Sequence, residues 1–304
     1  AIASGTREVR LCGAAGTGKS YLAAQFLKSL ALPKGDCIVV APSHKACGVI
    51  ADFLSEQDLH VEVKTVASLL GLKPRINRKT GKEEFVPEAD QVKSVEAKLL
   101  VIDEASMVSA DLDDWIRQAV ESSIFAPQIL WMGDLYQLPP IGEEKAASLL
   151  REMPEARLVQ PVRYSGAIGQ LCTSLRKKID GEAFAGITSD WDTESQSGVF
   201  CGEMGWWLDQ SIEAFKSKQA SLNKDHVRIV CYTNKAVEAA NSRIRKAILG
   251  EDAPEIVAGE WLVAREACVN SEGDILVSSS HEFVVKDAEK QQLDLTSCGN
   301  YPLS

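Results

Sequence analysis

Short apolar runs alternate with helix-like stretches through the first half of the chain. The runs are built mainly from Val, Ile, Leu, Met and Cys, and they lie at 9–12, 37–41, 99–102 and 129–132. Apolar runs of this length, separated by helical patterns, are typical of buried parallel strands joined by crossover helices. The pattern therefore predicts an α/β fold with a parallel sheet.

One segment interrupts this rhythm. Residues 72–94 are polar and basic, and they are centred on Lys79-Thr80-Gly81-Lys82. A glycine-containing turn between two short runs favours a hairpin. We expect this segment to be a β-hairpin excursion from the first domain.

A new pattern starts at Arg163. It predicts a helix over 166–180, a loop over 186–205, a helix near 208–218, a strand at 227–232 and a helix at 235–249. Beyond residue 254 the chain shows short β-like runs at 261–263, 275–277 and 283–285, with turn residues such as Glu272-Gly273-Asp274 between them. This texture favours a small β module. We expect three regions, at 1–158, 159–254 and 255–304.

Length and composition agree with a soluble chain of two domains. The 304 residues exceed the usual size of one hydrophobic core, and 45% apolar residues suffice to build two. The formal net charge of −10 argues against a protein that coats nucleic acid through bulk electrostatics. Local clusters matter more than the sum, and one basic cluster is present: Lys73, Arg75, Arg78, Lys79 and Lys82.

The sequence also bears on compartment and redox chemistry. No run approaches the roughly 18 uninterrupted apolar residues of a membrane span, and residues 1–7 lack the features of a signal peptide. We therefore expect no membrane partner and a cytoplasmic location, or the host cytoplasm if the chain is phage-encoded. The eight cysteines form no C-x-x-C pair, which favours buried thiols over zinc ligands or disulfides.

A complete phosphate-loop pattern follows the first apolar run. Strand, glycine loop and helix stand in the required order, which makes a chance match on a Gly-rich turn the weaker interpretation. The loop consists of Gly13, Ala14, Ala15, Gly16, Thr17, Gly18, Lys19 and Ser20. Glycines let backbone N–H groups surround a triphosphate, the lysine reaches the β- and γ-phosphates, and the serine hydroxyl is a Mg²⁺ ligand. The loop predicts a binding site for a nucleoside triphosphate.

Two further groups with suitable chemistry follow apolar runs. Asp103 and Glu104 end the run at 99–102, where one carboxylate can hold Mg²⁺ through water while its neighbour polarises the attacking water. Gln137 lies in Gly133-Asp134-Leu135-Tyr136-Gln137-Leu138-Pro139-Pro140, whose rigid Pro-Pro turn can hold it against the γ-phosphate. An ordinary solvated strand end and an ordinary turn are the alternative interpretations.

Several ordered segments resemble the motifs of superfamily 1 helicases, with the best match to the superfamily 1B group of RecD-like and phage Dda-like enzymes. Motifs I, Ia, Ib, II and III correspond to residues 13–20, 41–45, 64–70, 101–107 and 133–140. Residues 160–165 are similar to motif IV, and Tyr232-Thr233-Asn234-Lys235 continues the series. The resemblance spans nearly the whole chain.

This resemblance implies two RecA-like domains with parallel sheets, followed by the start of an inserted SH3-like β module, and it implies ATP and Mg²⁺ as cofactors. The implied nucleotide site comprises Lys19, Ser20, Asp103, Glu104 and Gln137 of the first domain, with Ser20 and Asp103 at the metal. Arg163 is implied to reach across from the second domain to the γ-phosphate.

The resemblance also implies a path for single-stranded DNA. Its candidate contacts are Pro42, Ser43, His44, Lys45, Thr65, Ser68, Phe85 and Asn234. Hydroxyls, imidazole and backbone N–H groups suit reversible phosphate contacts, and an aromatic ring on a strand-separating hairpin can stack on a base. The alternatives are a solvated helix start for His44 and Lys45, and packing of Phe85 against its own hairpin.

The chain departs from the helicase pattern in two places. The twelve residues before Gly13 contain no Gln for an adenine-recognition motif, and nothing after residue 254 resembles motifs V or VI. We therefore expect a fragment that stops inside the inserted module.

The function implied by the resemblance is that of an ATP-dependent DNA helicase or translocase. It would move 5′ to 3′ on single-stranded DNA and unwind duplexes at single-strand/duplex junctions. The alternatives are an RNA helicase of the same superfamily, a P-loop kinase, and a nucleotide-binding module without turnover. DNA-stimulated hydrolysis separates them.

Overall fold

The computed structural model describes residues 6–76, 83–88, 91–194, 196–265, 268–269, 275–277 and 282–287. The chain forms two compact units, Ala1–Phe200 and Cys201–Ser304, and each is described by itself. This division differs from the boundaries expected near residues 158 and 254, and the assignment of RecA-like domains to those ranges remains a prediction.

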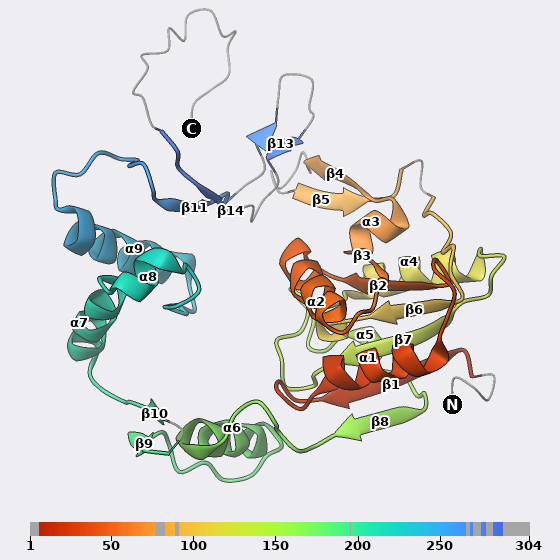
Figure 1. Cartoon of the computed structure of the whole chain (residues 1–304), viewed down its shortest axis with the longest axis horizontal. Coiled ribbons are helices and arrows are strands. Elements are labelled where there is room, and N and C mark those ends of the chain that lie inside the picture. The colour runs from red at the N-terminus through yellow and green to blue at the C-terminus, as the bar shows by residue number, and fades with distance from the viewer. Residues whose placement is uncertain are drawn as a thin grey trace, which may run out of the picture. The chain divides into compact units, whose positions relative to one another are not determined.

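Six parallel strands of the first unit form one sheet in the order β3-β2-β6-β7-β1-β8 (Figure 1). The strands are β1 (Glu8–Gly13), β2 (Cys37–Ala41), β3 (Glu62–Thr65), β6 (Leu99–Ile102), β7 (Gln128–Gly133) and β8 (Glu155–Leu158). The four apolar runs are thus confirmed as strands, and they are the four interior strands of the sheet.

Helices cover both faces of this sheet. One face carries α1 (Lys19–Leu30) and α2 (His44–Glu56), and the other carries α3 (Val66–Leu70), α4 (Ala110–Glu121) and α5 (Ala147–Leu150). Adjacent residues of one strand belong to opposite cores, as with Val39 and Val40, because a strand points successive side chains to opposite faces. Burial on both faces explains why the interior strands are almost uniformly apolar.

The pattern of apolar runs did not predict the two edge strands. β3 contains Glu62 and Lys64, and β8 contains Glu155 and Arg157. An edge strand has one open side, which tolerates and is often protected by charged residues. β8 is held beside β1 by an ion pair between Arg10 Nη2 and Glu155 Oε2 at 2.7 Å.

The polar excursion contains the predicted hairpin. β4 (Lys73–Ile76) pairs antiparallel with β5 (Glu83–Val86), and Pro74 lies opposite Phe85. The predicted turn at 79–82 lies outside the described residues, as do Arg78, Lys79 and Lys82 of the basic cluster.

The remainder of the first unit follows β8. The predicted helix is confirmed as α6 (Gly166–Ile179), whereas the expected loop contains a small antiparallel hairpin, β9 (Asp190–Asp192) with β10 (Ser197–Val199). The loop prediction was wrong here because Gly, Ser, Asp and Thr dominate the segment's composition. An aromatic contact between Trp191 and Phe200, with ring centroids 5.7 Å apart, packs the hairpin.

The second unit contains three helices and four short strands among its described residues. They are α7 (Met204–Phe215), α8 (Lys218–Leu222), α9 (Asn234–Leu249), β11 (Trp261–Val263), β12 (Cys268–Val269), β13 (Ile275–Val277) and β14 (Glu282–Val284). β11 pairs antiparallel with β14, and β12 with β13. The predicted helix at 235–249 and the β-like runs are confirmed, α7 begins earlier than expected, and the turn at 272–274 lies outside the described residues.

The strand predicted at 227–232 is wrong. These residues adopt no regular structure, and Val230 and Tyr232 are 92% and 103% exposed. A strand needs neighbours that accept its backbone hydrogen bonds and cover its apolar side chains. Among the described strands of this unit, none pairs with this segment.

Two further expectations concern membranes and thiols. In the part of the chain that the structure describes, no helix has the length and apolar character to cross a membrane. Cys12, Cys37 and Cys47 are buried free thiols, as predicted, but Cys201 is exposed.

Candidate functional site

The predicted motifs gather at one edge of the sheet because each follows the carboxyl end of a parallel strand. In sheet order, the segments 64–70, 41–45, 101–107, 133–140, 13–20 and 160–165 lie at the carboxyl ends of β3, β2, β6, β7, β1 and β8. Adjacent parallel strands end at the same edge, and this edge is the usual ligand site of α/β proteins. The nucleotide candidates follow β6, β7 and β1, and most nucleic-acid candidates follow β2 and β3.

The phosphate loop connects β1 to the N-terminus of α1. Gly16 and Gly18 have φ values of 75° and 90°, which glycine adopts without strain. The Lys19 ammonium donates hydrogen bonds to the carbonyl oxygens of Gly13 at 2.7 Å and Ala14 at 3.3 Å. The cation is therefore held over the loop beside a helix N-terminus, and both favour an anion.

Asp103 and Glu104 lie between β6 and a 3₁₀ turn, η2 (Ala105–Met107). Glu104 has φ 51° and ψ 42°, a left-handed conformation that is strained for glutamate by about 1–3 kcal/mol. Its Oε2 atom is buried without a hydrogen-bond partner in the described residues, while the neighbouring Gln137 side chain favours the ionised carboxylate. A strained backbone with an unpartnered carboxylate oxygen is typical of a site that holds a reacting group.

The electrostatics of the two carboxyl groups suit acid–base chemistry. Burial raises the pKa of Asp103 above its ordinary value. Burial, and then the charge of Asp103, raise the pKa of Glu104, while Lys19 opposes both shifts. A carboxyl group with a raised pKa accepts a proton more readily, which is the property of a general base.

Gln137 lies on a tight turn after β7. The Asp134 carboxylate accepts a hydrogen bond from the Tyr136 N–H at 2.9 Å, and the Asp134 carbonyl oxygen accepts one from the Gln137 N–H at 3.2 Å. The Gln137 side chain lies close enough to Glu104 to favour its ionised carboxylate, so the turn and the neighbouring strand end form one site. The structure thus brings together the predicted water-activating and γ-phosphate-sensing groups.

Arg163 belongs to a segment that covers the phosphate loop. The N–H groups of Val162 and Arg163 donate to the Gly16 carbonyl oxygen at 2.7 and 3.1 Å, and the Arg163 side chain is exposed. The structure places Arg163 in the same compact unit as the loop, whereas the resemblance assigned it to a second domain. Its contact with a γ-phosphate stays a prediction.

Two of the nucleic-acid candidates cap helices. Ser43 Oγ accepts a hydrogen bond from the Ala46 N–H at 3.2 Å at the start of α2, and Thr65 Oγ1 accepts one from the Ser68 N–H at 3.1 Å at the start of α3. Thr65 is buried, so its hydroxyl has a structural role as a cap. The exposed candidates at this edge are Ser43, His44, Lys45 and Ser68, and Pro42 is half-buried.

The last two nucleic-acid candidates lie elsewhere. Phe85 stands on β5 with 43% of its surface exposed, enough to offer a ring face to solvent. Asn234 is the first residue of α9 in the second unit, where it is exposed. Asn234 therefore belongs to a different compact unit from the other candidates, and its role stays a prediction.

Sequence reasoning missed two tyrosines beside the site. The Tyr164 hydroxyl donates to the Ala15 carbonyl oxygen at 2.7 Å, and the Tyr136 hydroxyl donates to Asp180 Oδ2 at 2.9 Å. One signal was available: Gly16 occupies a variable position of the phosphate-loop pattern, and a Cβ there would lie 2.8 Å from the Tyr164 ring. Glycine at this position satisfies both the left-handed backbone and the close approach of Tyr164.

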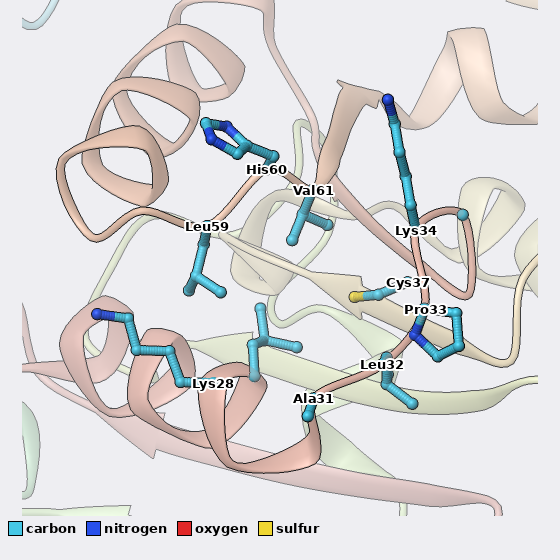
Figure 2. Close-up of a pocket in the computed structure, with 11 residues that line it drawn as sticks. Lys28, Ala31, Leu32, Pro33, Lys34, Cys37, Leu59, His60 and Val61 are labelled. Carbon is cyan, nitrogen blue, oxygen red and sulfur yellow. The ribbon is translucent and has the colours of Figure 1, made fainter.

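A separate cavity of about 350 Å³ opens near the amino-terminal end of β2. Figure 2 shows Leu59 and Val61 pointing toward its centre, with Lys28 on the side of α1. Burial raises the pKa of Cys37 in its wall to about 12, so this thiol stays protonated. Since none of the predicted site residues lines the cavity, the geometry does not connect it with nucleotide chemistry.

Comparison with known proteins identifies the first unit. Residues 1–189 match the family model described as AAA domain. The chain is 24% identical over 281 residues to the ATP-dependent DNA helicase Dda of Enterobacteria phage T4, an alignment that covers 88% of this chain and 58% of Dda. It is 33% identical over 141 residues to the ATP-dependent DNA helicase Pif1 of Campylobacter jejuni, covering 46% of this chain and 31% of that protein. The chain thus spans less than two thirds of either relative.

A solved structure supports the fold. The structure of Bacteroides Pif1 bound to single-stranded DNA aligns with 95% of this chain and 67% of that chain, at a TM-score of 0.50 and 20% sequence identity. The α/β fold around a parallel sheet is therefore shared with a helicase structure. The resemblance to superfamily 1B helicases, inferred from the ordered motifs, is confirmed by these relatives.

Proposed function

The chain belongs to the AAA domain family, and from that premise we propose that it hydrolyses ATP to drive movement along single-stranded DNA. The observation that carries the proposal is the order of segments at the carboxyl edge of the sheet. The residues predicted to bind nucleotide lie at the adjacent ends of β6, β7 and β1. The exposed residues predicted to bind nucleic-acid phosphates lie at the next strand ends along the same edge, those of β2 and β3. Such an arrangement can couple the hydrolysis of a bound nucleotide to the binding of a nucleic-acid strand.

The nucleotide chemistry assigns a role to each group. Lys19 and the loop N–H groups bind the β- and γ-phosphates, Glu104 accepts a proton from the attacking water, and Gln137 orients that water. Arg163 stabilises charge on the γ-phosphate. Asp134 fixes the turn that presents Gln137.

The residues also fit Mg²⁺. Asp103 offers a buried carboxylate at the end of β6, and Ser20 offers a hydroxyl in the first turn of α1; a carboxylate and a hydroxyl together with substrate phosphates form the usual donor set for this ion. When bound, Mg²⁺ neutralises the charge that develops between the β- and γ-phosphates.

The nucleic-acid partner is inferred from chemistry and from relatives. Ser43, His44, Lys45 and Ser68 offer exposed hydroxyl, imidazole and ammonium groups at one edge, which suit backbone phosphates. The relatives named above are DNA helicases, and one neighbour was solved with single-stranded DNA. We extend the proposal to unwinding at single-strand/duplex junctions in the 5′ to 3′ direction, which rests on the family resemblance.

The test is ATP hydrolysis by the purified chain with and without single-stranded DNA. We expect stimulation by DNA, and we expect Lys19→Ala to abolish it because the variant loses the phosphate-binding cation. Lys28→Ala, on the last turn of the same helix, is the matched control and should behave like the wild type.

The alternative outcomes identify the rival functions. Stimulation by single-stranded RNA but not DNA would indicate an RNA motor. Phosphorylation of a small acceptor without any effect of nucleic acid would overturn the proposal in favour of a kinase. Nucleotide binding without turnover would leave a regulatory module.

A further inference from the structure

Residues 162–164, which we call the strap, bind the phosphate loop through three hydrogen bonds. The N–H groups of Val162 and Arg163 donate to the Gly16 carbonyl oxygen at 2.7 and 3.1 Å. The Tyr164 hydroxyl donates to the Ala15 carbonyl oxygen at 2.7 Å. A Cβ at Gly16 would lie 2.8 Å from the Tyr164 ring and 2.9 Å from Arg163 Cβ, so glycine at this position permits the strap to approach.

These hydrogen bonds fix the direction of peptide groups in the loop. In a trans peptide the C=O and the following N–H point in opposite directions. Because Tyr164 holds the Ala15 carbonyl oxygen, the N–H of Gly16 is directed away from the strap. The Thr17 N–H is engaged within the loop by the Ala14 carbonyl oxygen at 3.2 Å. Tyr164 therefore controls the orientation of the Gly16 N–H, which has no acceptor among the described residues and can meet a phosphate oxygen.

Helix α6 contacts the strap through Arg176. The Arg176 guanidinium of α6 donates to the Tyr164 hydroxyl, and it also stands over the Tyr164 ring, with its central carbon 5.7 Å from the ring centroid. Helix α6 therefore fixes the position of Tyr164, and Tyr164 fixes the orientation of the loop peptide that it binds.

The end of the same helix holds the turn that presents Gln137. Asp180, the C-cap of α6, accepts the hydrogen bond from the Tyr136 hydroxyl at 2.9 Å. Tyr136 stands next to Gln137, and its N–H is fixed by Asp134. One helix thus contacts both the tyrosine that binds the phosphate loop and the turn that carries the γ-phosphate-sensing glutamine.

We propose that α6 positions the phosphate loop and Gln137 relative to each other, with Tyr164 and Tyr136 as positioning residues of the nucleotide site. The inference rests on the proposed ATP hydrolysis and adds residues outside its catalytic groups. Tyr164 acts on nucleotide binding through the loop amides. Tyr136 acts on the chemical step through Gln137.

The test compares Tyr164→Phe and Tyr136→Phe, each of which removes one hydroxyl and keeps the ring. We expect Tyr164→Phe to raise the Kd for a fluorescent ATP analogue about three- to tenfold, the size expected for one neutral hydrogen bond. Tyr136→Phe should leave that Kd unchanged and lower kcat about three- to tenfold. In the double variant the loss of kcat/KM should differ from the product of the single losses, because the hydrogen bonds of both hydroxyls act through one helix, α6.

Tyr21→Phe is the matched control. It removes the hydroxyl of an exposed tyrosine on α1, for which the described residues offer no hydrogen-bond partner. The stoichiometry of nucleotide binding gives the folded fraction of every variant, so a merely structural defect appears as fewer sites with an unchanged Kd. If Tyr164→Phe fails to fold, Arg176→Gln tests the same tie from the helix side.

The outcomes separate this inference from the proposed function. A wild-type chain that binds no nucleotide overturns the function itself. A wild-type chain that hydrolyses ATP, together with tyrosine variants that match Tyr21→Phe in both Kd and kcat, overturns the positioning role and leaves the function intact.

Discussion

Among single residues, Glu104 shows how a position proposed to act in catalysis opposes stability. Its backbone is left-handed, one carboxylate oxygen is buried without a partner in the described residues, and burial raises its pKa. A raised pKa means that the folded state favours the protonated carboxyl group. Ionisation above that pKa therefore lowers the free energy of unfolding. These features favour a role in the reaction over a role in stability.

The variant Glu104→Gln should separate the two roles. We expect ATP hydrolysis to fall by about 10²- to 10⁴-fold, since the amide cannot accept the proton of the attacking water. Nucleotide binding should persist, and the Tm at neutral pH should equal or exceed that of the wild type because no buried charge remains. Steady-state hydrolysis, nucleotide titration and thermal unfolding measure the three quantities. Glu121→Gln, at the end of α4, is the control, and a Glu104→Gln variant with lowered Tm would contradict this account.

The same carboxyl group predicts a pH dependence. Since the proposed hydrolysis uses the Glu104 carboxylate as its base, kcat should fall as the pH drops through the raised pKa, at a higher pH than for an ordinary glutamate. Over that interval the unfavourable contribution of the charge disappears, so the wild type should gain stability relative to Glu104→Gln. A kcat–pH profile and urea unfolding of both proteins test this. An identical pH dependence of stability in the two proteins would rule out the assigned shift.

Among elements, α4, α5, β1 and β7 meet at one guanidinium. Arg151, just after α5, donates to Asp113 of α4 at 2.8 and 3.0 Å and lies 3.5 Å from Glu8 of β1. It also stands 5.2 Å from the centroid of the Trp131 ring on β7. Asp113 has only 5% of its side chain exposed, so its charge depends on this partner. The network therefore holds the helices of one sheet face in place.

The variant Arg151→Met should destabilise the first unit by about 3–5 kcal/mol, because it leaves a buried carboxylate unpaired. The loss should be largest at high pH, where Asp113 is ionised. Lys98→Met removes the ion pair with Asp36. Because the Lys98 side chain is 60% exposed, this variant should change the free energy of unfolding by only about 0–1 kcal/mol. Urea unfolding compares them, and equal losses for the two variants would exclude a dominant role for Arg151.

The hairpin β4–β5 offers a test of Phe85. If the ring stacks on a base, Phe85→Ala should weaken binding of single-stranded DNA by about 1–3 kcal/mol with little effect on stability, since 43% of the residue is exposed. If the ring instead packs its own hairpin, stability should fall and DNA affinity should hold. Fluorescence anisotropy with a labelled oligonucleotide, paired with thermal unfolding, distinguishes the two.

Prediction from sequence succeeded for elements with a strong local signal and failed where the outcome depends on neighbours. The interior strands are apolar because both faces are buried, and the phosphate loop requires its glycines, so both could be predicted. Edge strands β3 and β8 are polar and gave no such signal. The run at 227–232 is apolar but finds no pairing strand among the described residues. The hydrogen bonds of the Tyr136 and Tyr164 hydroxyls join segments that are distant in the sequence, so they could not be predicted from it.

For the molecule as a whole, the two units differ in how much core they contain. The first has a sheet buried on both faces by two apolar clusters. Among the described residues of the second, Ile244 is the one buried apolar side chain, and no residue of α7 is buried. Few buried contacts mean low local stability. The second unit should therefore open more often than the first.

Hydrogen exchange read by mass spectrometry on the intact chain tests this difference. We expect amides of α7 and α9 to exchange orders of magnitude faster than those of β6 and β7, whose strands lie at the centre of the sheet. Addition of an ATP analogue with Mg²⁺ should slow exchange in the phosphate loop, at 103–107 and at 134–137, because all the nucleotide-type groups lie in the first unit. Protection that spreads into α9 would show that nucleotide also orders the second unit, whereas Lys19→Ala should show no protection at either place. Equal exchange in both units without nucleotide would contradict the assignment of stability to the first.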